Sequence, residues 1–446
     1  MPRRVTASPT PPSVPSTPLA IADYRKFLLA RFTSVVATTG MVVVLGYQLY
    51  DVARGTYHMS IAGAAFQLGI LGLVQFLPVL LLTPVAGVVA DRFDRRTVAS
   101  ASNCIDLAVA LSLALITRFG LHSLPLLFAL GALHGTARVF IGPAMSSIAP
   151  NIVPAALMPR AIAMNSLSWQ GGSVAGPALG GLLFATNAAL PYWAAAALLA
   201  FAALCISTIR RIPPPAGNRD THPVRQMAEG LSYVWNERFL LGCVSLDLFA
   251  VILGGATALL PVYARDILTI NGHPVGPDGL GLMRAAPAVG AALVAIFLSH
   301  RPIANNVGVK MLWAVVVYGA ATLGFGLSRN FGLSLGLLAM LGAADMVSVY
   351  IRSTLVQLNT PDEVRGRVSS ISGLAVSASN ELGEMQSGIA AVMLGATGAV
   401  VFGGAAAIVV TAIWAISFPE LKNARTFAPQ YRRFGKAGTD PANEGA

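Results

Sequence analysis

The sequence predicts an all-helical membrane protein with twelve transmembrane helices, arranged as two related halves of six. The first observation is composition: 55% of the 446 residues are hydrophobic and only 11% are charged, whereas a soluble domain carries about 25% charged residues. The second is that apolar segments of about 20 residues, the length needed to cross a bilayer, recur along the chain. The third is the lack of the alternating pattern of membrane β-strands, which favours a helical bundle over a barrel.

The apolar segments place the twelve helices in order. The first six are expected at 29–50, 63–90, 97–117, 124–148, 162–186 and 189–209. The second six are expected at 239–262, 279–299, 310–328, 331–356, 367–395 and 398–418. We therefore expect a disordered tail (1–28), a six-helix bundle (29–209), a polar linker (210–238), a second six-helix bundle (239–418) and a final tail (419–446). Within the linker, 224–237 suits a short amphipathic helix on the membrane surface.

The positions of Lys and Arg predict the orientation. The two tails and the loops after even-numbered helices hold 23 of the 30 Lys and Arg residues, and the opposite loops hold four. Since positively charged loops remain in the cytoplasm, both termini are expected there, in a multi-pass protein of a bacterial inner (plasma) membrane. These loops also account for the net charge of +11, so we expect no nucleic-acid partner.

The two halves resemble each other in sequence. When the chain is displaced by 207 residues, the difference between 238 and 31, Arg31-Phe32 aligns with Arg238-Phe239. The same displacement aligns Pro154 with Pro361 and Gly176 with Gly383. A parallel repeat of six-helix halves is typical of transporters that bind their substrate near the midplane between the halves.

The loop after the second expected helix carries a charged motif formed by Gly87, Asp91, Arg92, Arg95 and Arg96. It resembles the signature Gly-x-x-x-Asp-Arg-x-Gly-Arg-Arg of the major facilitator superfamily, with Asp94 in place of the second glycine. The resemblance implies a conformational latch, in which Asp91 accepts hydrogen bonds from helix N-terminal amides and from an arginine. The alternative is that the arginines only fix the orientation of the chain.

A glycine-rich motif lies in the fifth expected helix and consists of Gly172, Gly176, Pro177, Gly180 and Gly181. Glycines at these spacings leave a smooth helix face for close packing, and the proline favours a kink. The motif matches the antiporter signature of the same superfamily, which implies proton-coupled export. Ordinary packing by small residues is the alternative.

Two further segments narrow the resemblance. Residues 151–154 with 160–166, and residues 360–368, are similar to the bacterial exporter branch that includes the enterobactin exporter and related drug:proton antiporters. This resemblance implies a secondary transporter, not an enzyme, that exports an amphipathic small molecule such as a siderophore, metabolite or drug. It also implies a monomer in membrane lipid that needs no metal or cofactor.

Charged residues within apolar helices are the main candidates for proton coupling, because charge in a bilayer is costly and is usually kept for function. Glu381 and Glu384 stand three residues apart on one helix face, where two close carboxylates favour holding a proton. Asp247 in the seventh expected helix is the next candidate. Asp106 in the third is a weaker one, because that helix is often peripheral. The alternative for the two glutamates is a structural pair neutralised by an arginine.

Four residues are candidates for an intramembrane charge pair or for substrate contacts: Arg138, Asp345, Arg352 and His134. Arg138 and Asp345 are equivalent under the 207-residue displacement, so we expect them to meet across the pseudo-two-fold axis. His134 lies one helical turn before Arg138 and suits either proton relay or packing. Arg284 is expected near the outer end of its helix, where its side chain reaches the interface.

Candidate substrate contacts are Asn165, Trp169, Gln170 and Asn380. Two other functions remain open. One is a proton-coupled importer of an anionic or nutrient substrate, with Arg138 and Arg352 as its binding groups. The other is a transport-inactive membrane receptor of the same fold. The sequence has no phosphate-binding loop of the Gly-x-x-x-x-Gly-Lys-Ser/Thr type, so ATP is not the expected energy source.

Overall fold

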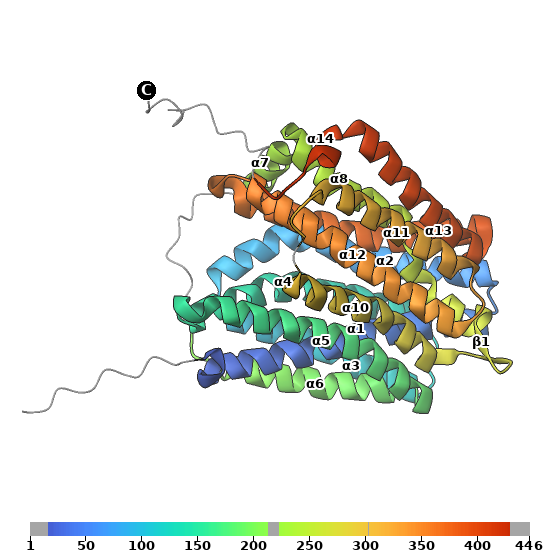
Figure 1. Cartoon of the computed structure of the whole chain (residues 1–446). Helices are drawn as coiled ribbons and strands as arrows, with labels where there is room; N and C mark the ends of the chain where they lie inside the picture. Colours follow the sequence, from blue (N-terminus) through green and yellow to red (C-terminus); the bar gives the residue numbers. More distant parts are fainter. Residues whose placement is uncertain (1–16, 213–222, 302, 429–446) are drawn as a thin grey trace, which may run out of the picture.

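A computed structural model describes residues 17–212, 223–301 and 303–428 of the chain, and it is almost entirely helical (Figure 1). The first half contains η1 (Pro18–Ala20), α1 (Ala22–Gly55), α2 (Ile61–Arg92), α3 (Arg95–Arg118), α4 (Leu124–Ile152), η2 (Ala155–Leu157), α5 (Met158–Thr186) and α6 (Leu190–Ser207). The helix α7 (Pro223–Asn236) connects it to the second half. This helix falls where the sequence predicts a short amphipathic helix at 224–237.

The second half starts with α8 (Arg238–Leu253), followed by the short η3 (Ala256–Leu259), α9 (Leu260–Val262) and the π-helix η4 (Tyr263–Ile267). A two-stranded antiparallel hairpin, β1 (Thr269–Ile270) and β2 (His273–Pro274), comes next. The chain continues with α10 (Gly276–His300), α11 (Val307–Leu327), α12 (Phe331–Asn359), α13 (Asp362–Ser417) and α14 (Pro419–Asn423). In Figure 1, α7 and α14 lie at one end of the bundle and β1 at the other. We call these the α7 end and the hairpin end.

The all-helical membrane fold is confirmed, because ten helices within the described residues are long and apolar enough to cross a bilayer. The expected number of twelve rests on two further segments. α5 is 29 residues long but is not among the ten. α13 is 56 residues long and breaks at Gly395, whose φ of 73° is outside the helical region. This break falls where the sequence predicts the end of one helix at residue 395 and the start of another at 398.

Three local boundaries differ from the expected ones. α1 starts at Ala22, so part of the expected disordered tail is helical. α14 similarly places Pro419–Asn423 of the final expected tail in a helix. The seventh expected helix is interrupted after Leu253, where Gly254 and Gly255 precede η3. A Cβ on Gly255 would lie 2.7 Å from the carbonyl oxygen of Gly383, so the break accompanies a close approach to α13.

Packing between helices joins the two halves along two seams. α2 packs against α13, and α5 packs against α10. One continuous apolar core runs through the hairpin end and includes residues of both halves, such as Leu45, Leu71, Leu280 and Ala391. At the α7 end each half has a separate core. The halves are therefore closed against each other at the hairpin end.

The glycines of α5 explain how these seams form. A Cβ on Gly176 would lie 2.1 Å from the Thr39 hydroxyl and one on Gly180 would lie 3.0 Å from the Gly40 carbonyl oxygen, so these glycines seat α5 on α1. On the next face, a Cβ on Gly181 would lie 2.4 Å from the Pro277 carbonyl oxygen. The motif thus packs α5 against α1 within its own half and against α10 of the other half.

Gly181→Ala is expected to open the hairpin end. Its methyl group cannot fit beside Pro277, and overpacking of this kind costs about 1–3 kcal/mol, or roughly a 5- to 150-fold shift in an equilibrium. The measurement is maleimide labelling of a cysteine placed at Ala65, which is fully buried in the α2–α13 seam. The background lacks Cys104, Cys205 and Cys243.

Gly171→Ala is the matched control, because the nearest atom to its new Cβ would lie 3.5 Å away. Equal labelling in both variants would show that the α5–α10 seam does not hold this end closed.

Candidate functional site

The site begins with an ion pair that joins the two halves. Arg138 on α4 and Glu381 on α13 are connected by a contact of 2.9 Å between Nη1 and Oε1. The side chain of Arg138 is 40% exposed and that of Glu381 is 10% exposed. The pair therefore combines a nearly buried carboxylate with an arginine that still reaches open space.

Glu384 lies one helical turn further along α13 and faces a second arginine. Its Oε1 lies 4.0 Å from Nη2 of Arg284 on α10. A Cβ on Gly72 of α2 would lie 2.8 Å from the Glu384 Cβ, so a glycine is needed where α2 passes this carboxylate. Helices α2, α4, α10 and α13 therefore meet around the two glutamates. The expectation that Arg284 sits at the outer end of its helix is wrong, because it lies two turns inside α10 and beside Glu384.

Arg138 does not meet Asp345 as the repeat predicts. It pairs with Glu381 instead, because α13 of the second half brings that carboxylate within reach. Asp345 lies on α12, two turns before Arg352, and forms no salt bridge in the described part of the chain. The symmetry of the sequence is thus not reproduced in the charge pairing.

A second charge pair lies within the second half. Asp247 on α8 and Arg352 on α12 form a close ion pair, and each side chain is only 10% exposed. Both residues line a cavity of about 310 Å³ between α8, α12 and α13. The cavity lining combines the charge pair and the polar Ser353, Gln357, Ser369 and Ser372 with Val244, Val349, Val356 and Val376. This mixture suits a ligand with both polar and apolar parts.

The expected substrate contacts do not line this cavity. Trp169 is 49% exposed on α5, and Asn380 is exposed on α13. Asn165 and Gln170 are half-buried, and Oδ1 of Asn165 is buried without a hydrogen-bond partner among the described residues. The structure therefore does not bring these four residues together with Asp247 and Arg352.

The expected latch is described only in part. The surroundings of Gly87 and Asp91 lie outside the described residues, and Arg92 is exposed. Nε of Arg95 is buried without a hydrogen-bond partner among the described residues. Asp94 caps α3 by accepting from the Arg96 amide, and its carboxylate pairs with the Arg96 side chain at 2.8 Å.

Arg96 also donates to the carbonyl oxygens of Ser207 and Ile209, so it ties the start of α3 to the end of α6. The conformational latch centred on Asp91 stays a prediction.

His134 faces a partner that the spacing in sequence did not reveal. Its Nδ1 lies 2.8 Å from Oδ1 of Asp106 on α3, and both side chains are almost completely buried. This pair lies within the first half, and its His134 is one turn of α4 before Arg138.

Ion pairs also close the hairpin end between the halves. Tyr50 donates to Asp266 at 2.5 Å, and Arg54 lies 3.4 Å from the same carboxylate. In a second ion pair the arginine belongs to the second half and the carboxylate to the first: Arg265 of η4 lies 3.2 Å from Asp51 of α1. Sequence reasoning missed this cluster because Asp51, Arg54, Arg265 and Asp266 lie in the loops after the first and seventh expected helices, where no local pattern indicates which loop residues meet.

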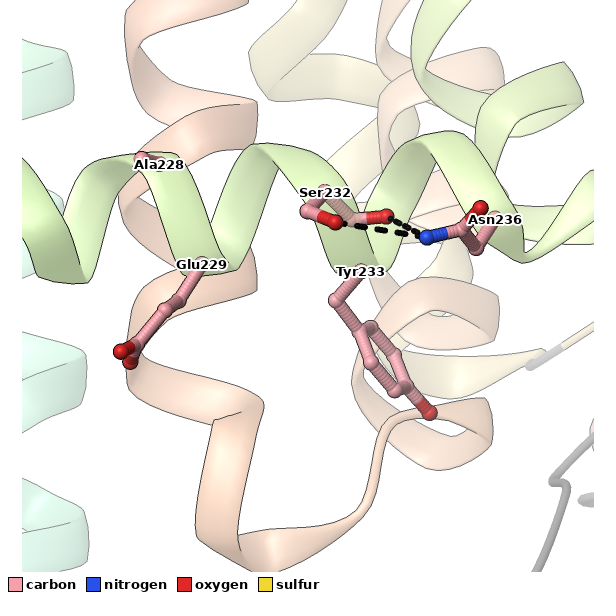
Figure 2. A pocket seen from close by; sticks show the side chains of 5 residues that line it. All are labelled: Ala228, Glu229, Ser232, Tyr233 and Asn236. Carbon is pink, nitrogen blue, oxygen red and sulfur yellow. Dashed lines mark hydrogen bonds between the residues drawn. The ribbon is translucent and has the colours of Figure 1, made fainter.

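Figure 2 shows the side chains that line a hollow on α7. It measures about 560 Å³ and is lined by Ala228, Glu229, Ser232, Tyr233 and Asn236. Asn236 donates to the Ser232 carbonyl oxygen at 2.8 Å within the same helix. Since all five lining residues belong to α7 outside the spanning helices, we do not assign the transported molecule to this hollow.

Comparisons with known proteins agree with the architecture. The profile of the Major Facilitator Superfamily matches residues 27–384. The enterobactin exporter EntS of Citrobacter koseri is 26% identical over 393 residues, which cover 85% of this chain and 90% of the relative. EntS of a strain of Escherichia coli is 25% identical over 419 residues, which cover 91% of this chain and 94% of the relative.

Solved structures share the fold at low identity. A peptide transporter POT superposes with a TM-score of 0.71 at 13% identity, covering 93% of this chain and all 100% of that one. A bacterial homologue of the human lysosomal transporter Spinster gives a TM-score of 0.65 at 16% identity, covering 92% of this chain and 99% of that one.

Asp247→Ala is expected to lower the stability of the protein, because it leaves Arg352 nearly buried without its counter-charge. Breaking such a pair costs about 3–5 kcal/mol, whereas replacing both partners by apolar residues is often neutral. The double variant Asp247→Leu/Arg352→Met should therefore recover most of the loss. Thermal unfolding of the purified protein in detergent measures both, and a double variant as unstable as the single one would contradict the pairing.

Asp266→Asn is expected to loosen the hairpin end, since it removes the charge that holds Arg54. Partly exposed ion pairs contribute up to about 1 kcal/mol, so labelling of a cysteine at Ala65 should rise roughly fivefold. Asp278→Asn changes an exposed acid at the same end and serves as the control. Similar labelling in the two variants would speak against Asp266 as a gate residue.

Proposed function

This chain belongs to the major facilitator superfamily, and from that premise we propose that it is a proton-coupled exporter of an amphipathic small molecule that works by alternating access. It is a membrane transporter rather than an enzyme. The finer statements, namely proton coupling, the outward direction and the kind of cargo, rest on the arguments that follow.

The Arg138–Glu381 pair carries the proposal. It is a contact between the halves at a nearly buried carboxylate, so it links the charge of one side chain to the relative position of α4 and α13. A proton on Glu381 removes the attraction for Arg138 and lets the halves separate along this line. A ligand or proton can shift a conformational equilibrium only by such a difference between states.

Glu384 is the second member of the proton site. It stands one turn from Glu381 on the same helix and faces Arg284, so the two carboxylates each have an arginine on a different helix. A proton that leaves Glu381 has a second acceptor within the same cluster. Asp247 is the third candidate, since it is paired with Arg352 beside the cavity of the second half.

The cavity beside Asp247 and Arg352 supports an amphipathic cargo. Its charge pair and serines offer donors and acceptors, and its valines offer apolar contact. The named relatives export enterobactin, so a siderophore is the first cargo class to test, followed by other amphipathic metabolites and drugs.

We further propose that the chain works as a monomer in the lipid of a bacterial inner membrane, with the α7 end and both termini in the cytoplasm. The excess of Lys and Arg in the loops of that end supports this orientation. The closed hairpin end then faces outward. During transport the two halves move as rigid bodies relative to each other, about the charged residues at the centre. The separate apolar cores of the α7 end are consistent with opening on the cytoplasmic side.

Glu381→Gln is expected to abolish cargo accumulation driven by a pH gradient, because the glutamine can neither take up nor release a proton. Exchange of cargo without a gradient should persist. The measurement is uptake of enterobactin into inverted vesicles with an acidic interior. Glu229→Gln is the matched control, because it makes the same change on the exposed α7.

Gradient-driven uptake that survives Glu381→Gln would refute its role as proton carrier. Accumulation in right-side-out vesicles instead of inverted ones would favour the importer, in which Arg138 and Arg352 bind the substrate. A lack of flux for every cargo tried would favour a receptor.

A further inference from the structure

The pair of Asp106 and His134 is the most buried charged group of the described chain and has no part in the contact between the halves. Each side chain is 1% exposed, and the pair is closed by a 2.8 Å contact between α3 and α4. Arg138 lies one turn after His134 on α4, but its side chain points to Glu381 on the other half. The first half therefore contains an ionisable pair of its own, next to the interhalf ion pair.

Buried polar groups extend the pair along α3. Asn103 lies one turn before Asp106 and is fully buried, and its Oδ1 accepts a hydrogen bond of 2.8 Å from the Ser34 hydroxyl on α1. Three polar atoms in this cluster have no partner among the described residues: Asn103 Nδ2, Asp106 Oδ2 and His134 Nε2. Buried polar atoms in proteins nearly always have a partner, either in the protein or in ordered water.

The unpartnered atoms of α3 are complementary. Asn103 Nδ2 is a donor and Asp106 Oδ2 is an acceptor, and residues three apart on a helix lie side by side. One water molecule can accept from the amide and donate to the carboxylate. A buried site with two or more polar partners is the kind that holds such a water.

The charge of the cluster is balanced only with a proton. Helices α1, α2 and α6 pack around α3 and α4. Ser34 of α1 binds Asn103, and Arg31 stands one turn before it on the same helix. The Gln75 backbone of α2 lies against Gly135, next to His134, and Arg138 of α4 pairs with Glu381. α6 has no Asp, Glu, Lys, Arg or His between Leu190 and Ser207. Among the described residues, His134 is the only group that forms an ion pair with Asp106. A net charge inside a membrane bundle is energetically costly, so a neutral pair is favoured.

We propose that Asn103, Asp106 and His134 form an occluded proton-binding site of the first half, completed by one water molecule. The proton is held either as imidazolium beside carboxylate or as imidazole beside carboxylic acid, and in both forms the pair is neutral. Its consequence for transport rests on the proposed function. Without the proton the pair is negatively charged at Asp106, whose partner His134 lies one helical turn before Arg138, so the pair then competes with Glu381 for the guanidinium.

The test uses the full chain in lipid nanodiscs and needs no cargo. His58, His122, His222, His273 and His300 are replaced by Asn, which leaves His134 as the sole histidine. Magnetic resonance of isotope-labelled histidine and aspartate then reads the protonation of the imidazole ring and of the Asp106 carboxyl at neutral pH. Asp106→Asn assigns the carboxyl signal, and Asp106→Glu does so if the first variant does not fold.

The expected result at neutral pH is either a protonated ring beside an ionised carboxylate or a neutral ring beside a protonated carboxyl. In Asp106→Asn the ring is expected to be neutral. Magnetisation transfer from water to the Asn103 amide should also be observed. A neutral ring beside an ionised carboxylate would overturn the proton site, and a dry Asn103 would overturn its water. Failure of proton-driven flux in vesicles bears on the proposed function alone, since these measurements involve no transport.

Discussion

The rest of the charged site is arranged around the ion pair between Arg138 and Glu381. Each partner stands within an apolar bundle, where an uncompensated charge is costly, so each requires the other as long as Glu381 is ionised. Because the two residues belong to different halves, their electrostatic attraction holds the halves together. Glu384 with Arg284, one turn away, repeats the arrangement between α13 and α10 of the same half.

Close helix packing puts these charges in reach of one another. The glutamates meet α2 only because Gly72 leaves room, and α5 meets α10 only because Gly181 and Gly281 do so. The same seams hold the hairpin end closed, together with Tyr50, Arg54 and Asp266. A change that enlarges one of these glycines therefore acts on the position of the halves, while a change of charge acts on the energy of holding them there. The two kinds of variant separate packing from electrostatics.

The first half has a different electrostatic arrangement from the second. In the second half, Asp247 is balanced by Arg352, a group that keeps its charge at all accessible pH values. In the first half, Asp106 is balanced by His134, whose charge depends on a proton. The buried charge pairs of the two halves therefore differ in their partners, and they do not lie at equivalent positions of the repeat.

The sequence by itself determined the membrane class, the helical fold and most helix positions, because apolar length and glycine or proline placement act locally. It also identified Glu381, Glu384, Asp247, Arg138 and Arg352 as notable, since any charge in an apolar helix is conspicuous. Only the tertiary structure decided the partners. Whether Arg138 reaches Asp345 or Glu381, and whether Arg284 faces lipid or Glu384, depends on the rotation and crossing of helices far apart in the chain. The break before η3 and the pairing of Asp106 with His134 likewise follow from contacts between helices, which no local pattern specifies.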